Sequence, residues 1–599
     1  MIKKLKQIIA RYFESFTFFY RQLRYRVFLT VIISIIVGVL DGFGLSMFMP
    51  LLQMVSGAEQ ASGDSMGNLS FIVEGLEAIG IPLDLVSILL VMIVFFFFKG
   101  IATFANASYR IIIRNLFIKK LRTQMLHAFN RLSYKHFVLS DVGRIQNTMS
   151  GEVERVSESF NFYFRTAEQG ILVAVYMGFA FFVDAQFALL VTVGGWLTNF
   201  LYKLIYKRTK GTSKIFTKDS HSYQGQIIQH VANFKYLKAT SLLSDYGSHL
   251  KKSIDKIEVS RKRMGILNAI VGAAREPLLI VIVAVVIIVQ AKLLSAPLGP
   301  ILVSLLFFYR ALTALMSMQN SWNRFLELSG SLSNVIAFQE ELQQHKERTG
   351  SKPFETLQKS IEIERGWFSY DEEPVLWDID LTIPKNRTIA FVGESGSGKT
   401  TLVNIIAGLM PLDRGKLLID GTDSGELDIH TYQNRIGYIT QEPVIFSDTI
   451  FNNVTFWDEK SDETLERFHT ALEKAAILEF VMGLPDKEET ILGNNGVNLS
   501  GGQKQRISIA RELYKEIDLL IMDEATSSLD SETEKAIQAS IDALKGEYTI
   551  LIVAHRLSTI RNADEIVMLK DGRIDRIGKY SELISAHKDF KRMVELQKL

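Results

Sequence analysis

The stretch GESGSGKT at residues 393–400 decides the fold of the second half of the chain, because it fits the phosphate-binding pattern G-x-x-x-x-G-K-[ST]. It follows the apolar run TIAFVG and opens a helix-like segment near Thr401. Its glycines let backbone N–H groups close around phosphate oxygens, Lys399 adds a positive charge, and Thr400 offers a hydroxyl to Mg²⁺. We therefore predict that a nucleotide is bound by Gly393, Glu394, Ser395, Gly396, Ser397, Gly398, Lys399, Thr400 and Thr401.

The run DLLIMDE at residues 518–524 supplies a second element of the same kind of site. Its apolar residues predict a buried strand that ends in two carboxylates. Paired acids are often only a solvated loop, but this pair follows a buried strand downstream of a phosphate loop. We expect Asp523 to belong to the magnesium shell and Glu524 to polarise an attacking water.

The two halves of the chain differ in composition. Beyond about residue 350, short apolar runs alternate with helical segments, which predicts an α/β domain. The first half holds apolar runs long enough to cross about 30 Å of hydrocarbon as helices. We read six spans, at about 26–55, 84–107, 167–184, 186–206, 265–290 and 298–318.

The charges in the loops give an orientation. The loop 56–83 has no Lys or Arg, whereas the N-terminal segment and the connections after the second and fourth spans are rich in both. The positive-inside rule therefore places both termini and the two long connections in the cytoplasm. Buried helices of a large soluble protein are the alternative, but they do not predict this asymmetry.

These patterns divide the chain into four parts. We expect an interfacial N-terminal segment at 1–25, a six-span membrane domain at 26–335, a linker at 336–355 and a nucleotide-binding domain at 356–599. The chain has no cysteine, which excludes disulfides, thiolate metal sites and cysteine nucleophiles. Its 67 basic residues nearly cancel 65 acidic ones, and nothing indicates a nucleic-acid partner.

Between the two nucleotide elements lies LSGGQ, residues 499–503. With it the chain resembles the ATP-binding cassette (ABC) transporters, and six spans followed by one cassette resemble an exporter half-transporter. The resemblance implies a membrane all-α domain joined to a cytoplasmic α/β ATPase with a helical subdomain. It also implies ATP and Mg²⁺ as cofactors, and a second chain whose signature closes over each ATP.

The resemblance assigns roles to individual residues. It implies that Ser500, Gly501, Gly502 and Gln503 bind the ATP held by the partner chain, and that Tyr370 in WFSYDEEP stacks on adenine. Gln441 in ITQEP would sense magnesium, His555 in VAHRLS would lie beside the γ-phosphate, and Asp530 in SSLD would couple the two sites. For Tyr370 an ordinary strand residue is the alternative.

An intact pair of Glu524 and His555 favours a homodimer, because heterodimeric relatives often have one degenerate site. One departure is Asn494 in LGNNG, where exporters commonly carry a glutamate; this puts a charged contact with the membrane domain in doubt. The segments 140–156 and 230–241 resemble the coupling regions that transmit cassette movement to the membrane.

Several charged residues lie within the expected spans. Arg310 is on a polar face of span six, opposite apolar residues such as Phe308 and Leu312. A cation near the bilayer centre costs about 2.5–3.5 kcal/mol on insertion scales and marks a functional site by default. Arg275 lies in span five and Lys99 in span two.

These cations suggest a phosphate-bearing substrate, because guanidinium groups bind phosphate in bidentate fashion. We take Arg310, Arg275 and Lys99 as candidate substrate residues. Alternatively, Asp41 or Glu276 forms structural ion pairs with them, or Lys99 snorkels toward the cytoplasmic side.

The membrane half resembles the bacterial lipid-linked oligosaccharide flippases in GFGLSMFMPLLQ, MSGEVERVSESF and FFYRALTALM. This implies a polyprenyl-pyrophosphate-linked glycan, or a related glycolipid, moved to the outer leaflet of a bacterial inner membrane. The alternatives are a multidrug or peptide exporter with an apolar cavity, and an ATP-gated channel or regulator. The intact hydrolytic residues argue against gating alone.

Overall fold

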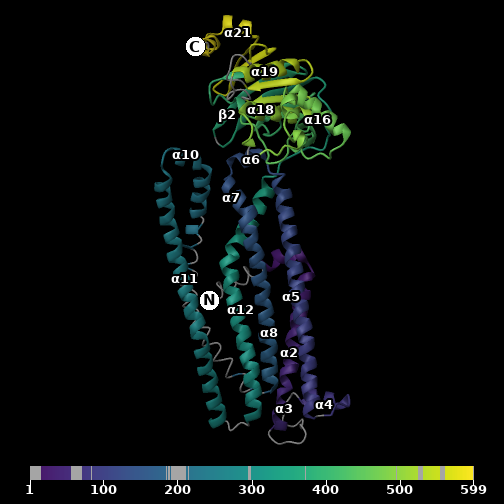
Figure 1. Cartoon of the computed structure of the whole chain (residues 1–599), viewed down its shortest axis with the longest axis vertical. Coiled ribbons are helices and arrows are strands. Elements are labelled where there is room, and N and C mark those ends of the chain that lie inside the picture. The colour runs from purple at the N-terminus through teal and green to yellow at the C-terminus, as the bar shows by residue number, and fades with distance from the viewer. Residues whose placement is uncertain are drawn as a thin grey trace. The chain divides into compact units, whose positions relative to one another are not determined.

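A computed structural model describes residues 15–55, 70–82, 84–183, 185, 189, 211–212, 215–216, 218–220, 222–293, 298–371, 373–493, 496–523, 531–553 and 560–597. The chain forms two compact units (Figure 1). The first, the membrane unit, comprises residues 1–130 and 141–344, and the second, the cassette unit, comprises residues 131–140 and 345–599.

The membrane unit is helical throughout its described residues. Its elements are α2 (Arg26–Ser46), α3 (Phe48–Val55), α4 (Ser70–Ala78), α5 (Leu85–Phe129), α7 (Val142–Asn147), the π-helix η2 (Thr148–Glu152), α8 (Val153–Val183), α10 (Phe234–Ala239), α11 (Leu243–Leu293) and α12 (Leu298–Gln344). Three described segments are long and apolar enough to cross a membrane: Arg26–Leu52, Leu85–Phe129 and Val142–Val183. The helices α11 and α12 cover the fifth and sixth expected spans.

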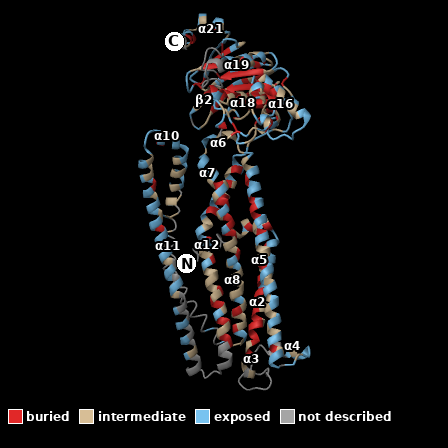
Figure 2. Ribbon diagram, in the orientation of Figure 1, coloured by how far each residue is buried: buried red, intermediate tan, exposed pale blue. Residues whose placement is uncertain are grey.

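Packing in the membrane unit follows the apolar faces of these helices. α12 lies along α8, and α2 packs against both α5 and α8. Buried side chains line the interior of this group, whereas the described side chains of α11 are mostly exposed (Figure 2). The fourth expected span, 186–206, lies almost wholly outside the described residues.

The described part of the expected N-terminal interfacial segment packs against the bundle. Residues 15–23 are helical, and Phe19 is fully buried. Its ring lies 5.5 Å from that of Phe117 and 5.3 Å from that of Phe160, in edge-to-face geometry. Such aromatic pairs add about 0.5–1.5 kcal/mol each beyond area burial, so this segment is anchored by its aromatic face.

The cassette unit is α/β, as the alternating pattern predicts. Its strands are β1 (Ser360–Ser369), β2 (Pro374–Pro384), β3 (Thr388–Gly393), β4 (Arg414–Ile419), β5 (Thr422–Asp423), β6 (Ile436–Ile439), β7 (Leu519–Asp523), β8 (Thr549–Val553), β9 (Glu565–Lys570) and β10 (Arg573–Gly578). They form a four-stranded sheet in the order β2-β1-β4-β5 and a six-stranded sheet in the order β10-β9-β3-β8-β7-β6. In the larger sheet only β10 is antiparallel to its neighbour.

Helices cover both faces of the larger sheet. They are α13 (Lys399–Ile406), α14 (Ile429–Gln433), α15 (Ile450–Thr455), α16 (Asp462–Lys474), α17 (Leu478–Met482), the 3₁₀ turn η3 (Lys487–Glu489), α18 (Gly501–Tyr514), α19 (Ser531–Ala543), α21 (Tyr580–Ala586) and α22 (Lys588–Gln597). Alternate residues of β7 enter different cores, Leu520 and Met522 on one face and Leu519 and Ile521 on the other. This burial on both faces explains why these strands are continuous apolar runs.

The boundaries between the units differ from the expected ones. α12 continues to Gln344, so helix takes up the first part of the segment 336–355 that we expected to be a linker. A short helix, α6 (Tyr134–Leu139), belongs to the cassette unit. The element that contacts the cassette therefore precedes most of the segment 140–156, in which we expected the first coupling region.

Candidate nucleotide and transport sites

The nucleotide elements meet at one edge of the six-stranded sheet. Val553 of β8 is paired with Phe391 of β3 on one side and with Asp523 of β7 on the other. The phosphate loop follows β3 and Asp523 ends β7, and these two parallel strands lie on either side of β8. Both are therefore at the carboxyl ends of the strands, the place where open α/β sheets bind ligands.

The backbone of the phosphate loop needs glycine at two positions. Gly398 has φ +97°, and a Cβ there would lie 2.6 Å from Leu376 Cδ2. At Gly393 a Cβ would lie 2.3 Å from the carbonyl oxygen of Leu569. The Lys399 Nζ is held inside the loop, where it donates to the carbonyl oxygens of Gly393 at 2.9 Å and Glu394 at 2.8 Å.

The loop has the features of an anion cradle. Glu394, Ser395, Gly396 and Thr400 are exposed, so a ligand has access to the backbone there. Ser397 is buried, and its Oγ has no hydrogen-bond partner among the described residues. Because an unpaired buried hydroxyl is costly, a phosphate oxygen at this position would relieve it.

The residues expected to hold Mg²⁺ supply the oxygen ligands that this ion prefers. Thr400 opens α13, Asp523 ends β7, and Gln441 follows β6. Tyr438 lies within β6, next to β7, and its hydroxyl donates to Asn404 Oδ1 at 3.1 Å. Burial, together with the charge of Asp523, raises the pKa of Tyr438, so the phenol stays neutral beside this carboxylate. The donor set fits the ion.

Tyr370 lies just beyond the end of β1, where the sheet meets the phosphate-loop helix. Its ring packs edge-to-face on Phe368, with centroids 5.0 Å apart. Its hydroxyl lies 3.4 Å from Thr401 Oγ1, within α13. The expected adenine-stacking residue is therefore next to the phosphate loop.

The signature residues form the beginning of α18. Ser500 caps this helix by accepting from Gln503 N–H at 3.3 Å, while Gln503 Oε1 accepts from Ser500 N–H at 2.8 Å. Ser500 and Gly501 are exposed at the positive end of the helix, and Gly502 is buried. α18 packs on α15, α16, α19 and β6, whereas α13 packs on β2, β3 and β8. The signature and the phosphate loop are thus held by different groups of elements.

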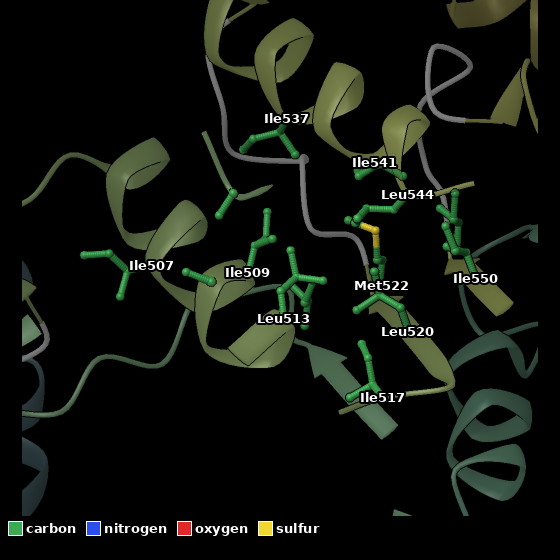
Figure 3. Packing of buried hydrophobic residues seen from close by; sticks show 14 of the residues in the cluster. Ile507, Ile509, Leu513, Ile517, Leu520, Met522, Ile537, Ile541, Leu544 and Ile550 are labelled. Atoms are coloured by element: carbon green, nitrogen blue, oxygen red, sulfur yellow. The ribbon is translucent and has the colours of Figure 1, made fainter. Parts of the chain in front are cut away.

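Apolar side chains fix the signature helix on the sheet. Figure 3 shows Ile509 and Leu513 of α18 lying beside Leu520 and Met522 of β7, with side chains of α19 above them. All of these side chains are at most 8% exposed. The signature helix therefore packs directly on the strand that ends in Asp523.

Arg511 of the signature helix was missed by sequence reasoning, although it is a cation among the buried residues Ile509, Ala510 and Leu513. It is 4% exposed. Its Nε donates to the carbonyl oxygen of Asn453 at 2.6 Å, and its Nη1 donates to that of Val444 at 2.7 Å. Burial lowers the pKa of Arg511. The residue ties α18 to the segment that follows Gln441.

Four expected site residues lie outside the described part of the chain: Glu524, Asp530, His555 and Asn494. The strands that precede two of them are described: β7 ends at Asp523, and β8 ends at Val553. Asp523 and Val553, the last residues of these two adjacent strands, are paired at the same edge of the sheet.

In the membrane unit, Lys99 is paired. Its Nζ lies 2.6 Å from Asp41 Oδ1, and the Asp41 side chain is 1% exposed. The hydroxyl of Tyr176 donates to Asp41 Oδ2. This is the arrangement of the structural alternative, in which Asp41 forms an ion pair with a cation of the spans.

Arg310 has a different environment. It is partly exposed. On the same helix, Phe308 and Leu312 are buried as the apolar face predicts, while Thr313 and Ser317 of the polar face remain partly exposed. Arg275 lies within α11, but its side chain is outside the described part of the structure.

Two family profiles match the chain. The one described as "ABC transporter transmembrane region" covers residues 27–319, and the one described as "ABC transporter" covers residues 376–527. A solved structure described as a bacterial Atm1-family ABC exporter with ATP bound has a TM-score of 0.76 at 20% identity, over 96% of this chain and 99% of that chain. This likeness shows the fold.

Curated relatives extend over both halves. An "ATP-dependent lipid A-core flippase" of Cupriavidus pinatubonensis is 30% identical over 82% of this chain and 84% of its own length. One of Vibrio vulnificus is 27% identical over 98% of both chains. A "Putative multidrug export ATP-binding/permease protein YgaD" of Bacillus subtilis is 28% identical over 80% of this chain and 83% of its own length. The chain therefore belongs to the ABC transporters, as a multi-pass exporter half-transporter whose ATPase domain binds ATP and is coupled to transport.

Proposed function

We propose that this exporter is a flippase for an amphipathic, anionic lipid-linked substrate, a polyprenyl-pyrophosphate-linked oligosaccharide or a related glycolipid. One observation carries the proposal. Among the described residues, the guanidinium of Arg310 has no carboxylate and no hydrogen-bond acceptor, whereas Lys99 is neutralised by Asp41.

An unpaired cation within a span is costly, and its retention calls for a ligand. Arg310 is partly exposed on the polar face of α12, so an anionic headgroup has access to it. A planar guanidinium binds two oxygens of a phosphate at once. Apolar residues of the same helix that are partly exposed, such as Leu305 and Leu306, suit the lipid chain of such a substrate.

The printed names of the relatives support a lipid substrate, since several of them are lipid A-core flippases. The relative named as a putative multidrug exporter favours a second candidate, an exporter of apolar drugs. The two differ in the charge that they require of the substrate, because Arg310 attracts an anion and repels a cation.

For the motor we propose the ATPase cycle of a homodimer in a bacterial cytoplasmic membrane, with the cassettes in the cytoplasm. Gln441, Thr400 and Asp523 would hold Mg²⁺, which supplies charge neutralisation at the phosphates. Glu524 polarises water and His555 contacts the γ-phosphate, while Ser500 to Gln503 of the partner chain close the site and Asp530 couples the two sites. Exposed apolar side chains of α11, such as Ile280, Val281 and Val285, suit lipid or a second copy.

The substrate test compares ATP hydrolysis in proteoliposomes with and without each candidate compound. A polyprenyl-pyrophosphate glycolipid is expected to stimulate hydrolysis, and Arg310→Ala is expected to remove that stimulation, expressed relative to the variant's own basal rate. Arg324→Ala is the matched control, because Arg324 lies on the same helix in an exposed ion pair with Glu327. Stimulation by a cationic amphiphile that Arg310→Ala leaves unchanged would favour the drug exporter.

A further inference from the structure

The short helix α6 belongs to the cassette although its neighbours in sequence are membrane helices. It connects α5 to α7 along the chain. Ser133 N–H donates to the carbonyl oxygen of His345 at 3.0 Å, and Glu347 N–H donates to that of Arg131 at 2.8 Å. Tyr134 packs against the core that contains the four-stranded sheet. α6 therefore packs as part of the cassette unit, while the chain on either side of it continues into α5 and α7.

Lys135 of α6 makes two contacts with the end of β1 and its surroundings. Its Nζ lies 3.0 Å from Asp413 Oδ1 and 4.9 Å from the centre of the Phe368 ring. The side chains of Lys135 and Asp413 are 27% and 39% exposed. Phe368 is 1% exposed, so its ring position is set by this environment.

These two contacts continue to the residue expected to stack on adenine. Asp413 Oδ2 accepts from Ser369 N–H at 2.7 Å and from Ser369 Oγ at 2.8 Å. The Phe368 ring meets Tyr370 edge-to-face, and the Tyr370 hydroxyl lies 3.4 Å from Thr401 Oγ1. Lys135 thus contacts Phe368 directly and Ser369 through Asp413. Tyr370 is in turn held by its contact with Phe368.

We propose that Lys135 is a positioning residue of the nucleotide site, which holds the end of β1 so that Tyr370 presents its ring to the base. The proposal rests on the function proposed above, in which Tyr370 stacks on adenine. A base that fixes Tyr370 also fixes Phe368, and thereby favours the position of α6 that this structure shows. Because such coupling is reciprocal, displacement of α6 lowers affinity for the base and leaves the phosphate contacts unchanged.

The contacts of Lys135 with Asp413 and Phe368 are weak enough to form and break reversibly. A partly exposed ion pair and a single cation–π contact of a partly exposed lysine are each weak, which allows α6 to separate from the cassette during a transport cycle. Loss of the Lys135 charge is expected to weaken base binding roughly two- to five-fold, the change that a contact of this class supports.

The test measures binding to the full-length protein by calorimetry with two probes in Mg²⁺ buffer. The first, the non-hydrolysable ATP analogue AMP-PNP, has a base, and the second, inorganic tripolyphosphate, has none. The variants are Lys135→Met, Tyr370→Ala and the double substitution. Lys570→Met is the control, since Lys570 also forms an ion pair, a more exposed one, with Asp589 on the same unit.

We expect Lys135→Met to weaken AMP-PNP binding roughly two- to five-fold and to leave tripolyphosphate binding unchanged. In the Tyr370→Ala background the same substitution is expected to have no further effect, and Lys570→Met is expected to have none in any background. An unchanged AMP-PNP affinity in Lys135→Met would overturn the inference. Equal weakening of both probes, or the same factor in the Tyr370→Ala background, would overturn it as well. If Tyr370→Ala itself leaves AMP-PNP binding unchanged, the stacking role within the proposed function fails, and the inference fails with it.

Discussion

The ion pair of Lys99, whose side chain is 23% exposed, with the buried Asp41 gives a quantitative prediction about the membrane unit. Lys99→Met removes the cation and leaves the Asp41 carboxylate, 1% exposed, with the Tyr176 hydroxyl as its remaining partner among the described residues. Breaking a buried ion pair from one side costs about 3–5 kcal/mol, because one charge stays buried and uncompensated.

A matched double substitution separates the pair from other effects. In Lys99→Met/Asp41→Asn no charge is left buried, and the amide retains the shape of the carboxylate and its contact with Tyr176. We expect this variant to recover most of the lost stability, since replacing both members of a buried pair is often close to neutral.

The assay is thermal unfolding of the detergent-solubilised protein. With 2–4 °C per kcal/mol for domains of this size, Lys99→Met is expected to lower Tm by on the order of 10 °C. Arg324→Met is the control, because its ion pair with Glu327 is exposed and contributes little. If Lys99→Met leaves Tm unchanged but abolishes stimulation by substrate, Lys99 is a substrate residue and the structural assignment is refuted.

Three further predictions concern the cassette. Arg511→Met leaves the buried carbonyl of Asn453 and the partly buried carbonyl of Val444 without their donor, and is expected to lower cassette stability by about 1–3 kcal/mol, measured as the midpoint of chemical unfolding. Gly398→Ala brings a Cβ to 2.6 Å from a leucine methyl and is expected to weaken AMP-PNP binding more than tenfold, whereas Gly421→Ala, at φ +78° with open space around it, is not. Burial acts to raise the pKa of Asp518, but hydrogen bonds from Arg435 and from backbone outweigh it and hold the pKa below its usual value of about 3.9. A carboxyl group whose pKa is lowered by folding stabilises the folded state at pH values above its usual pKa, and this contribution is lost as pH falls through the folded pKa. Asp518→Asn removes the titrating group, so it is expected to flatten the fall in Tm between pH 5 and pH 3.

The motor was predictable from sequence because its elements are contiguous. The residues of the phosphate loop determine its backbone conformation locally. Gly398, for example, adopts a φ of +97°, which glycine allows and other residues rarely adopt. The strand before Asp523 is a continuous apolar run because both of its faces are buried. Patterns of this kind need no knowledge of distant partners.

The contacts that set electrostatics were not predictable, because they join residues far apart in the chain. Sequence reasoning left open whether Lys99 snorkels or is paired, and only the packing of α2 against α5 brings Asp41 to it. Lys135 and Asp413 are separated by 278 positions. Arg511 was missed for the same reason, since its partners are backbone carbonyls of another segment, which leave no pattern in the sequence.

The first coupling region shows a limit of a different kind. The expectation at 140–156 rested on resemblance to the family, whereas the short helix that belongs to the cassette unit is α6, Tyr134–Leu139. Within α6, Tyr134 packs on the cassette core, and Lys135 contacts Asp413 and Phe368. Nothing in the sequence of α6 itself identifies these partners. A helix this short has too few turns for periodicity to identify its contacting face.

The central claim is ATP-driven movement of an anionic lipid-linked substrate between leaflets, and translocation itself tests it most directly. A fluorescent polyprenyl-pyrophosphate glycolipid is placed in the outer leaflet of vesicles whose cassettes face outward, and its protection from an impermeant quencher is followed after ATP is added. The account predicts that protection rises with ATP for the wild type and does not rise for Glu524→Gln or Arg310→Ala. Unchanged protection of the glycolipid, with ATP-dependent accumulation of a cationic amphiphile in the same vesicles, would contradict it.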